Sequence, residues 1–384
     1  MQTNSYRDEL LETFQWFHRH PELSYEEVET TKKLKALLTA KGITVLDTGL
    51  ATGLVAQVGT GKQPVIAIRC DIDGLPITEE ADVPYISTVP GKMHGCGHDF
   101  HTTAVLGAAY LLKEKEAELP GTVKILFQPA EEAPGGALDV IKTGVLDDVQ
   151  RIFGLHVTPA QDVGTVGLRS GADSAAVDAF KFTFIGKGAH AAHPELGIDP
   201  IVIATNFINA VQTVVSRTMN AFAPGVVSVT HIAAGNTWNV IPETAFVEGT
   251  ARTTTPEDRA LVRSRIVKLA EDIAGAYGAT VDTDWYAGPP ATNNSPELEQ
   301  FVAEVAREAG LTPVVREPSL GGEDFAYYEE RIKGFFFHIG TGRSYSLHNP
   351  KFKVDPAALY PAACFMAQLA QKVLADPALG VRHD

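Results

Sequence analysis

Two short segments of the chain hold side chains that can bind a metal ion. In the run His94–Asp99, Cys96 and His98 stand two residues apart, with a glycine on either side of the cysteine. Glycine lets the backbone turn sharply, so the thiolate and the imidazole can converge on one ion. This pair suits zinc, manganese, cobalt or nickel and does not choose among them. The alternative is an ordinary buried cysteine beside unrelated histidines.

The second segment holds two adjacent carboxylates, Glu131 and Glu132. They follow the apolar stretch 123–127 through Gln128-Pro129-Ala130. Open α/β sheets place their ligand sites beyond the ends of strands. One carboxylate can therefore bind a metal while its neighbour accepts a proton from water as a general base. A solvated pair of surface acids is the alternative.

Two further histidines extend the set of possible ligands. His156 closes the apolar stretch 152–155, and His348 lies in a polar turn near the C-terminus. Either histidine alone is more often a hydrogen-bonded structural residue than a ligand. Five ligands exceed the needs of one tetrahedral ion and suit two ions that share a ligand, a role open to the thiolate. The five are Cys96, His98, Glu132, His156 and His348.

An acidic segment and a late loop can support such a centre. Asp71 and Asp73 are spaced to face the same way on an extended segment. They can bind metal or orient imidazoles, and we expect the second role. The loop 321–326 can be a bare turn, or it can support the site from the returning half of the chain.

Three residues in the middle of the chain can contact a substrate. His190 lies in a glycine-broken loop, Asn239 precedes Val240-Ile241-Pro242, and Arg252 ends an apolar stretch. Taken singly, each can equally be a turn, a cap or a solvated residue.

The first part of the chain alternates between strand and helix patterns. Residues 65–68 are apolar without alternation, which is typical of a strand covered on both faces. Helices that alternate with such strands favour a layered α/β domain. The expected strands are 54–58, 65–68, 123–127 and 152–156, and the expected helices are 6–20, 25–41, 101–113 and 137–142.

The pattern changes near residue 176. Residues 178–185 alternate, with three phenylalanines on one face, which predicts a half-buried strand. The order strand, helix, strand, strand, helix, strand predicts a ferredoxin-like sandwich inserted into the larger α/β domain. Its expected strands are 178–185, 226–232, 245–252 and 280–286, and its expected helices are 200–219 and 256–277. We therefore expect a large domain of residues 1–175 and 289–384, and an inserted domain of residues 176–288.

Composition limits the function. The chain has 384 residues, enough for two domains, and a net charge of −15, whereas a nucleic-acid binder needs a dense positive face. The first residues lack the apolar segment of a signal peptide. The chain contains no run of 18 apolar residues, so we expect no segment that crosses a membrane. Three cysteines form no disulfide framework. We expect a cytoplasmic protein with reduced thiols that binds neither nucleic acid nor membrane.

Taken in order, these motifs resemble the M20 metallopeptidase superfamily. Within it they resemble the branch of aminoacylases and N-acyl-amino-acid amidohydrolases, which includes hippurate hydrolase-like enzymes, auxin-conjugate hydrolases and N-acetylcysteine deacetylases. The resemblance covers essentially the whole chain. Its motifs are His20-Pro21-Glu22-Leu23, the Asp71/Asp73 segment, the Cys96/His98 run, Glu131-Glu132, the His190 loop, Asn239-Val240-Ile241-Pro242, Gly322–Ala326 and His348.

The resemblance implies a large α/β catalytic domain with a central mixed sheet, interrupted by a smaller ferredoxin-like lid and dimerisation domain. It implies two divalent metal ions (Mn²⁺, Zn²⁺, Ni²⁺ or Co²⁺) on the five ligands above, with Glu131 as the catalytic base. His190 matches a lid residue that in many relatives reaches the partner's active site. Asn239 and Arg252 match positions that hold the substrate's carbonyl oxygen and carboxylate.

One segment departs from the wider superfamily. Most members have a His-x-Asp ligand motif where this chain has Asp71-Ile72-Asp73. The branch compensates with Cys96 and His98. Because a ligand histidine is replaced, we expect partial metal occupancy at rest.

The implied activity is hydrolysis of N-acyl amino acids, for example N-acetylcysteine, to a carboxylic acid and the free amino acid. A homodimer or homotetramer would form through the lid. One alternative is a dipeptidase or other exopeptidase on the same scaffold. The other is a non-catalytic ligand-binding protein, against which the intact Glu131 argues, since such a protein needs no general base.

Overall fold

The computed structural model describes residues 2–59 and 61–380, which form two compact units. The large unit contains the described residues up to 171, together with 293–317 and 324–380. The small unit contains 172–292 and 318–323. The chain leaves and re-enters the large unit near two short strands, β7 (Gly171–Ala172) and β14 (Asn293–Asn294).

A mixed sheet of eight strands forms the centre of the large unit. Four neighbouring strands at its middle, β4, β3, β5 and β16, run parallel, and antiparallel strands flank them. The α/β class with a central mixed sheet is thus confirmed. In spatial order the strands are β1 (Thr44–Val45), β2 (Leu54–Gly59), β4 (Thr122–Gln128), β3 (Val65–Asp71), β5 (Arg151–Thr158), β16 (Gly334–Gly340), β6 (Thr165–Leu168) and β15 (Thr312–Val315).

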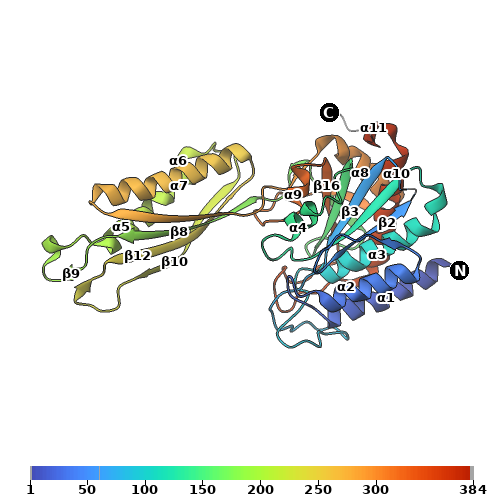
Figure 1. The fold of residues 1–384 in the computed structure, drawn as a ribbon, viewed down its shortest axis with the longest axis horizontal. Helices are drawn as coiled ribbons and strands as arrows, with labels where there is room; N and C mark the ends of the chain where they lie inside the picture. Colours follow the sequence, from blue (N-terminus) through green and yellow to red (C-terminus); the bar gives the residue numbers. More distant parts are fainter. Residues whose placement is uncertain (1, 60, 381–384) are drawn as a thin grey trace. The chain divides into compact units, whose positions relative to one another are not determined.

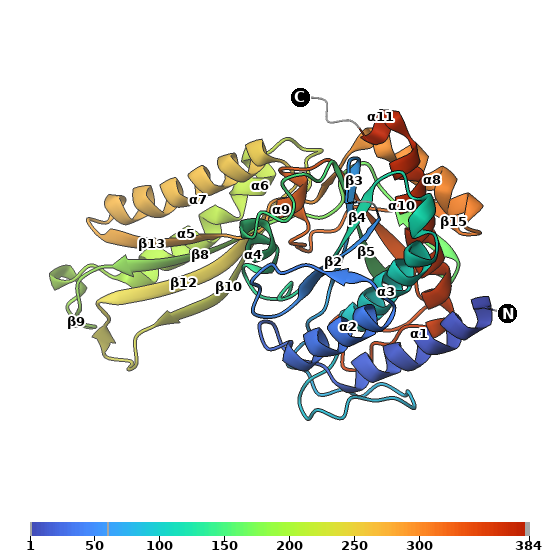
Figure 2. The same ribbon diagram turned by 45° about the vertical axis from the view of Figure 1, so that its right-hand side comes forward.

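Helices cover both faces of this sheet, so strands β3, β4 and β16 are buried at every position. Along β3, Ile66 and Ile68 belong to the larger core, whereas Val65 and Ala67 belong to the smaller core on the other face. This explains their unbroken apolar sequence. Figure 2 shows α1, α2 and α3 on one side of the sheet.

The helices of the large unit divide between these two cores. Those of the larger core are α1 (Gln2–Arg19), α2 (Val28–Ala40), α3 (His98–Glu114), α8 (Pro296–Glu308) and α10 (Leu359–Ala375). Those of the smaller core are α4 (Gly136–Lys142) and α9 (Ala326–Glu329). Short helical turns complete the unit: η1 (Glu116–Glu118), η3 (Pro356–Ala358) and α11 (Pro377–Gly380).

The parallel strands determine where a site can form. Because β3, β4 and β5 point the same way, their carboxyl ends meet at one edge of the sheet. The chain beyond β3 carries Asp73, the chain beyond β4 carries Glu131 and Glu132, and β5 carries His156 close to its end. Helix α3 begins at His98, three residues earlier than the sequence predicted.

The small unit is a four-stranded antiparallel sheet with helices on one face (Figure 1). Numbered along the unit, its strands lie in the ferredoxin-like order 4-1-3-2. Phe182 and Phe184 from β8 pack against Phe207 of α5. The strands are β8 (Ala176–Ile185), β10 (Gly225–Ala234), β12 (Thr244–Thr253) and β13 (Thr280–Ala287), and the helices are α5 (Pro200–Val211), α6 (Thr213–Thr218) and α7 (Pro256–Ala276).

One expectation about elements was wrong, and two short strands were missed. The single helix expected over residues 200–219 is two helices that meet at Gln212. Strands β6 and β15 were not expected, because they are short and contain Gly167 and Pro313, which are rare within strands. Within residues 2–59 and 61–380, no helix is long and apolar enough to cross a membrane.

Candidate metal centre

The five expected ligands of the large unit come together in two overlapping groups. Cys96, His98 and His156 form one group, and Cys96, Glu132 and His348 form the other. Within each group the ligand atoms lie within 4.8 Å of one another. Cys96 belongs to both groups, which is the position that a bridging ligand between two ions would hold.

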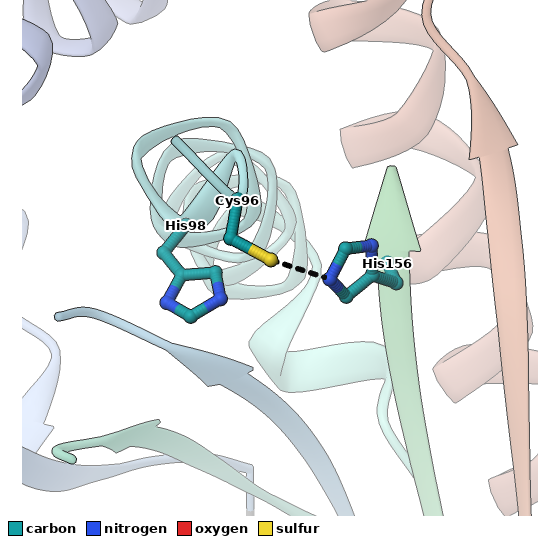
Figure 3. Close-up of side chains that lie close together, drawn as sticks. All are labelled: Cys96, His98 and His156. Atoms are coloured by element: carbon teal, nitrogen blue, oxygen red, sulfur yellow. Dashed lines mark hydrogen bonds between the residues drawn. The ribbon is translucent and has the colours of Figure 1, made fainter. Parts of the chain in front are cut away.

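His156 presents one nitrogen to Cys96 (Figure 3). Its Nδ1 lies 2.7 Å from the carbonyl oxygen of Val157, which can only accept a hydrogen bond, so Nδ1 carries the proton. Burial lowers the pKa of His156 well below its usual range, so the ring is neutral. The lone pair of Nε2 therefore faces the Cys96 sulfur, 3.4 Å away. This is the arrangement of a metal-binding imidazole whose other nitrogen is held by a backbone carbonyl.

His98 is held in the same manner by a carboxylate. Its Nδ1 lies 3.1 Å from Oδ1 of Asp73. Its buried Nε2 has no hydrogen-bond partner among the described residues and lies 3.8 Å from Asp71 Oδ1 and 4.0 Å from Glu132 Oε1. Burial opposes protonation of His98, but the carboxylates outweigh burial and raise its pKa well above the usual range. The surroundings of Nε2 thus favour a positive charge.

Glu132 and His348 complete the second group. Oε1 of Glu132 is buried and lies 3.1 Å from Nε2 of His348, and this carboxylate raises the pKa of His348. The backbone of His348 adopts a left-handed φ of 63° and donates to the carbonyl of Gly95, 2.8 Å away. Such strained backbone persists only where the surroundings hold it, and here it ties the late loop to the residue before Cys96.

The turn that carries Glu131 and Glu132 is also strained and braced. Ala130 has a φ of 52°, and its amide donates to Oε1 of Glu27, a fully buried carboxylate, at 2.8 Å. The amide of Glu132 donates to Oδ2 of Asp73 at 3.0 Å. The carboxylate of Glu131 lies within 4.8 Å of ligand atoms of His98 and Glu132. The turn therefore brings Glu132 into the ligand cluster and keeps Glu131 beside it.

Gly97, between Cys96 and His98, has a conformational reason to be glycine. Its φ is 83°, and a Cβ atom there would lie 2.5 Å from Cγ2 of Val157. Gly95 has an ordinary backbone, and a Cβ there would only touch Leu75 at 3.3 Å. Of the two glycines around the cysteine, Gly97 is the one that the local geometry requires.

These observations fit two divalent ions. His98 Nε2 is buried, lacks a hydrogen-bond partner among the described residues and faces Glu132 Oε1, which pairs with His348 Nε2 at 3.1 Å. His156 is held in the tautomer that frees Nε2 for a metal. Thiolate, imidazole and carboxylate are the donors that zinc and its neighbours in the first transition series accept.

Sequence reasoning missed three supporting residues. His101 follows His98 by one helical turn, a spacing that could have indicated it. Its Nε2 accepts the Val157 amide at 2.8 Å, so its proton sits on Nδ1, which donates to Oδ1 of Asp71 at 2.6 Å. Both nitrogens are engaged, so His101 supports the site and does not ligate a metal. Glu27 and Ser24, which donates to Asp73 at 2.7 Å, had no signal in the sequence.

His94 and Asp99, at the ends of the Cys96 run, lie outside the ligand groups. Asp99 accepts from Nδ1 of His18 at 2.6 Å, and Nε2 of His18 lies 2.9 Å from Glu79. Burial opposes protonation of His18, but the two carboxylates outweigh burial and raise its pKa to about 9. Burial lowers the pKa of His94 to about 4. The Asp99 end of the run is therefore anchored by a buried, charged histidine.

The three middle residues lie in the small unit, where His190 and Asn239 are neighbours and Arg252 lies apart from both. The strand that contains His190, β9 (Ala189–His190), pairs with β11 (Val240–Ile241) beyond the end of β8, and the Asn239 carbonyl accepts the Ala191 amide at 3.1 Å. Arg252 pairs with Val177 at the opposite end of the sheet. The eight residue steps from Val177 to Ile185 correspond to roughly 25 Å along the strand. The described chain therefore does not bring His190 to Arg252 within one small unit.

Comparisons with known proteins place the chain among metal-dependent hydrolases. The model of peptidase family M20/M25/M40 matches residues 67–372. An N-acetyl-L-cysteine deacetylase of Bacillus subtilis (strain 168) is 46% identical to this chain, and the match covers 93% of this chain and 86% of the deacetylase. The IAA-amino acid hydrolase ILR1-like 5 of Arabidopsis thaliana is 39% identical to this chain, and the match covers 96% of this chain and 87% of the hydrolase.

A solved structure also matches along nearly the whole chain. It is the YXEP protein of Bacillus subtilis, described as a dinuclear metal binding peptidase from the M20 family. The two share 42% sequence identity and a TM-score of 0.88, with 97% of this chain and 99% of the other covered.

Proposed function

The chain belongs to peptidase family M20/M25/M40 and is a metal-dependent hydrolase of N-acyl amino acids, and we propose that N-acetyl amino acids, N-acetylcysteine among them, are its preferred substrates. One observation carries the proposal. The braced turn holds Glu131 beside the clustered ligands, in a chain that is 46% identical to an N-acetyl-L-cysteine deacetylase. A mere binding site needs ligands, whereas hydrolysis also needs a base.

Two divalent ions bind the cluster, and we propose Mn²⁺, Zn²⁺, Ni²⁺ or Co²⁺ with Cys96 as the shared ligand. Imidazole nitrogens of His98 and His156 and the carboxylate of Glu132 suit these ions, and His348 completes the set. When bound, the ions supply Lewis acidity, which activates a water molecule and polarises the amide carbonyl.

The residues of the chain then act on protons and position. Glu131 accepts a proton from the attacking water and delivers it to the amide nitrogen as the amine departs. Asp73 holds the His98 ring through Nδ1 and the Glu132 backbone through its amide, so that both keep their orientation during turnover. Asp71 holds His101 against the same strand end.

The small unit supplies the contacts to the rest of the substrate. Arg252 pairs with the α-carboxylate, which explains how a chain with a net charge of −15 binds an anionic substrate. Asn239 and His190 donate to the carbonyl oxygen, where negative charge develops in the transition state.

The separation of His190 from Arg252 supports a homodimer. They lie at opposite ends of one sheet, roughly 25 Å apart along β8, and an N-acyl amino acid spans far less than that. Both can contact one substrate only if they come from different chains. We therefore propose that His190 acts on the partner's site, in a dimer or tetramer formed through the small unit.

The free cysteines, two of them buried, are in keeping with the cytoplasm as the proposed location.

A second candidate activity is cleavage of dipeptides, because the structural relative is described as a peptidase. Purified protein loaded with Mn²⁺ or Zn²⁺ should release amine from N-acetyl amino acids faster than from dipeptides with the same C-terminal residue. Faster release from the dipeptides would identify a dipeptidase instead.

A further inference from the structure

A buried polar network lies behind the ligand cluster in the large unit, and none of its members is a proposed ligand. We propose that Arg69, Gln128 and Asp324 are positioning residues that fix the Asp71 carboxylate behind His98 and thereby set the metal affinity of the centre. We call Arg69, Gln128, Asp324 and Tyr328 the Asp324 network. The inference rests on the proposed metal centre.

Asp324 is the hub of this network. It is 5% exposed and accepts from Arg69 Nη2 at 2.6 Å, from Gln128 Nε2 at 2.8 and 3.0 Å, and from the Ala137 amide at 3.0 Å. The Ala137 amide belongs to the first turn of α4, where a carboxylate is favoured. The aspartate thus joins the returning half of the chain to the ends of two central strands.

Gln128 has one allowed orientation. Arg69 Nε can only donate, so the oxygen of the Gln128 amide must face it at 2.9 Å, and the NH₂ group must face Asp324. The same oxygen accepts from the hydroxyl of Tyr328 at 2.9 Å. Because each group determines the direction of the next, displacement of one changes the position of the Arg69 side chain.

Arg69 connects the Asp324 network to Asp71. Its Nη1 donates to Asp71 Oδ2 at 2.7 Å, while Asp71 Oδ1 accepts from His101 at 2.6 Å. Both carboxylate oxygens are held, and Oδ1 lies 3.8 Å from the open Nε2 of His98. The position of Asp71 relative to this nitrogen therefore depends on Arg69, and through Arg69 on Asp324.

Charge gives the network its effect on metal ions. Arg69 and Asp71 are fully buried and Asp324 nearly so. Burial raises the pKa of Asp324 to about 6, and above that pH the three side chains together carry one net negative charge. In such a poorly screened place that charge favours cations at the adjacent cluster. Well-packed apolar residues would serve stability as well as a buried ion triad does, so stability alone does not account for these residues. The substitution Asp324→Asn cancels the net charge and frees Arg69 to move.

The test measures the affinity of metal-free full-length protein for Mn²⁺ by competition with a chelating dye. We expect Asp324→Asn to bind Mn²⁺ about 10- to 100-fold more weakly than wild type, the range for lost ligand-supporting partners. At saturating Mn²⁺, Asp324→Asn should again hold two ions per chain, because the substitution leaves all five ligands in place. Asp148→Asn, which removes a partly exposed carboxylate paired with Lys124, is the matched control and should bind as wild type does.

Tyr328→Phe covers the case in which Asp324→Asn does not fold. It removes one hydroxyl at the outer end of the network, and we expect a smaller loss of affinity in the same direction, about 2- to 5-fold. Wild-type affinity in every folded variant would overturn the inference while leaving the metal centre in place. Failure of the wild-type protein itself to bind any of Mn²⁺, Zn²⁺, Ni²⁺ and Co²⁺ would instead overturn the proposed function.

Discussion

Nε2 of His156 lies 3.4 Å from the sulfur of Cys96, although 60 positions separate the two residues in the chain (Figure 3). Cys96 stands just before the start of α3 and His156 near the end of β5, so the contact exists only because α3 packs on the sheet beside that strand. The metal centre is thus assembled by the tertiary fold. Substitution of a ligand residue should therefore reduce metal binding without unfolding the protein.

Replacing the shared ligand tests this order of events. Cys96→Ala should leave the fold intact and reduce the metal content from two ions per chain to one or fewer, because the sulfur belongs to both ligand groups. Metal-to-protein ratio after dialysis measures this. Cys70→Ala is the control, since Cys70 is fully buried in the larger core and outside the ligand groups: it should keep both ions and lower the thermal midpoint. Two ions retained by Cys96→Ala would exclude the bridging role.

Gly97 offers a test of backbone geometry. Gly97→Ala should destabilise the fold by about 1–2 kcal/mol from the left-handed backbone alone, and the contact with Val157 should displace Cys96 or His98 and weaken metal binding. Adding Val157→Ala relieves that contact and should restore part of the affinity. Gly95→Ala, at an ordinary backbone position, should have a much smaller effect. Equal effects of the two glycine substitutions would contradict the geometry.

His18 predicts a pH dependence of stability. Its folded pKa of about 9 lies above its unfolded value of 6.5, so its pairing with Asp99 and Glu79 stabilises the fold fully below pH 6.5 and is lost as pH rises through 9. A pKa rise of this size corresponds to about 3 kcal/mol for a buried group. The thermal midpoints of wild type and His18→Gln should therefore differ most near pH 6 and converge toward pH 9.5. A difference that stays constant over this range would show that His18 is not charged in the fold.

Subunit mixing tests the shared active site. Glu131→Gln and His190→Ala should each be nearly inactive as homodimers. After the two variants exchange subunits, half of the dimers are mixed and hold one intact site each, so about a quarter of wild-type activity should return. Glu131→Gln mixed with Asn239→Ala gives a second pair with the same expected gain if Asn239 accompanies His190. No gain in either mixture, with exchange verified, would place His190 in its own chain's site or outside catalysis.

Local patterns predicted most of the strands that carry the site. The continuous apolar stretch 65–68 and the position of Glu131 and Glu132 after another such stretch both reflect strands buried on two faces, which leave a visible mark in the sequence. The α/β class was predictable for the same reason. The roles of the individual site residues, and the functional division at residues 176 and 288, stay predictions.

The supporting partners had no such mark. Glu27 holds the Ala130 amide across 103 positions, and Arg69 holds Asp324 across 255. Side chains that meet at this separation are fixed by the packing of whole elements, and no local period encodes them. The break at Gln212 was missed for another reason: residues 201–219 contain no glycine or proline that would mark a helix end.

The central claim is that Glu131 is the general base of a metal-dependent N-acyl amino acid hydrolase. The most direct measurement is amine release from N-acetyl amino acids by wild type and Glu131→Gln, each with its metal content determined. We predict that Glu131→Gln keeps the fold and both ions and loses at least ~10²-fold in kcat with little change in KM. Normal turnover by Glu131→Gln at full metal content would contradict the account.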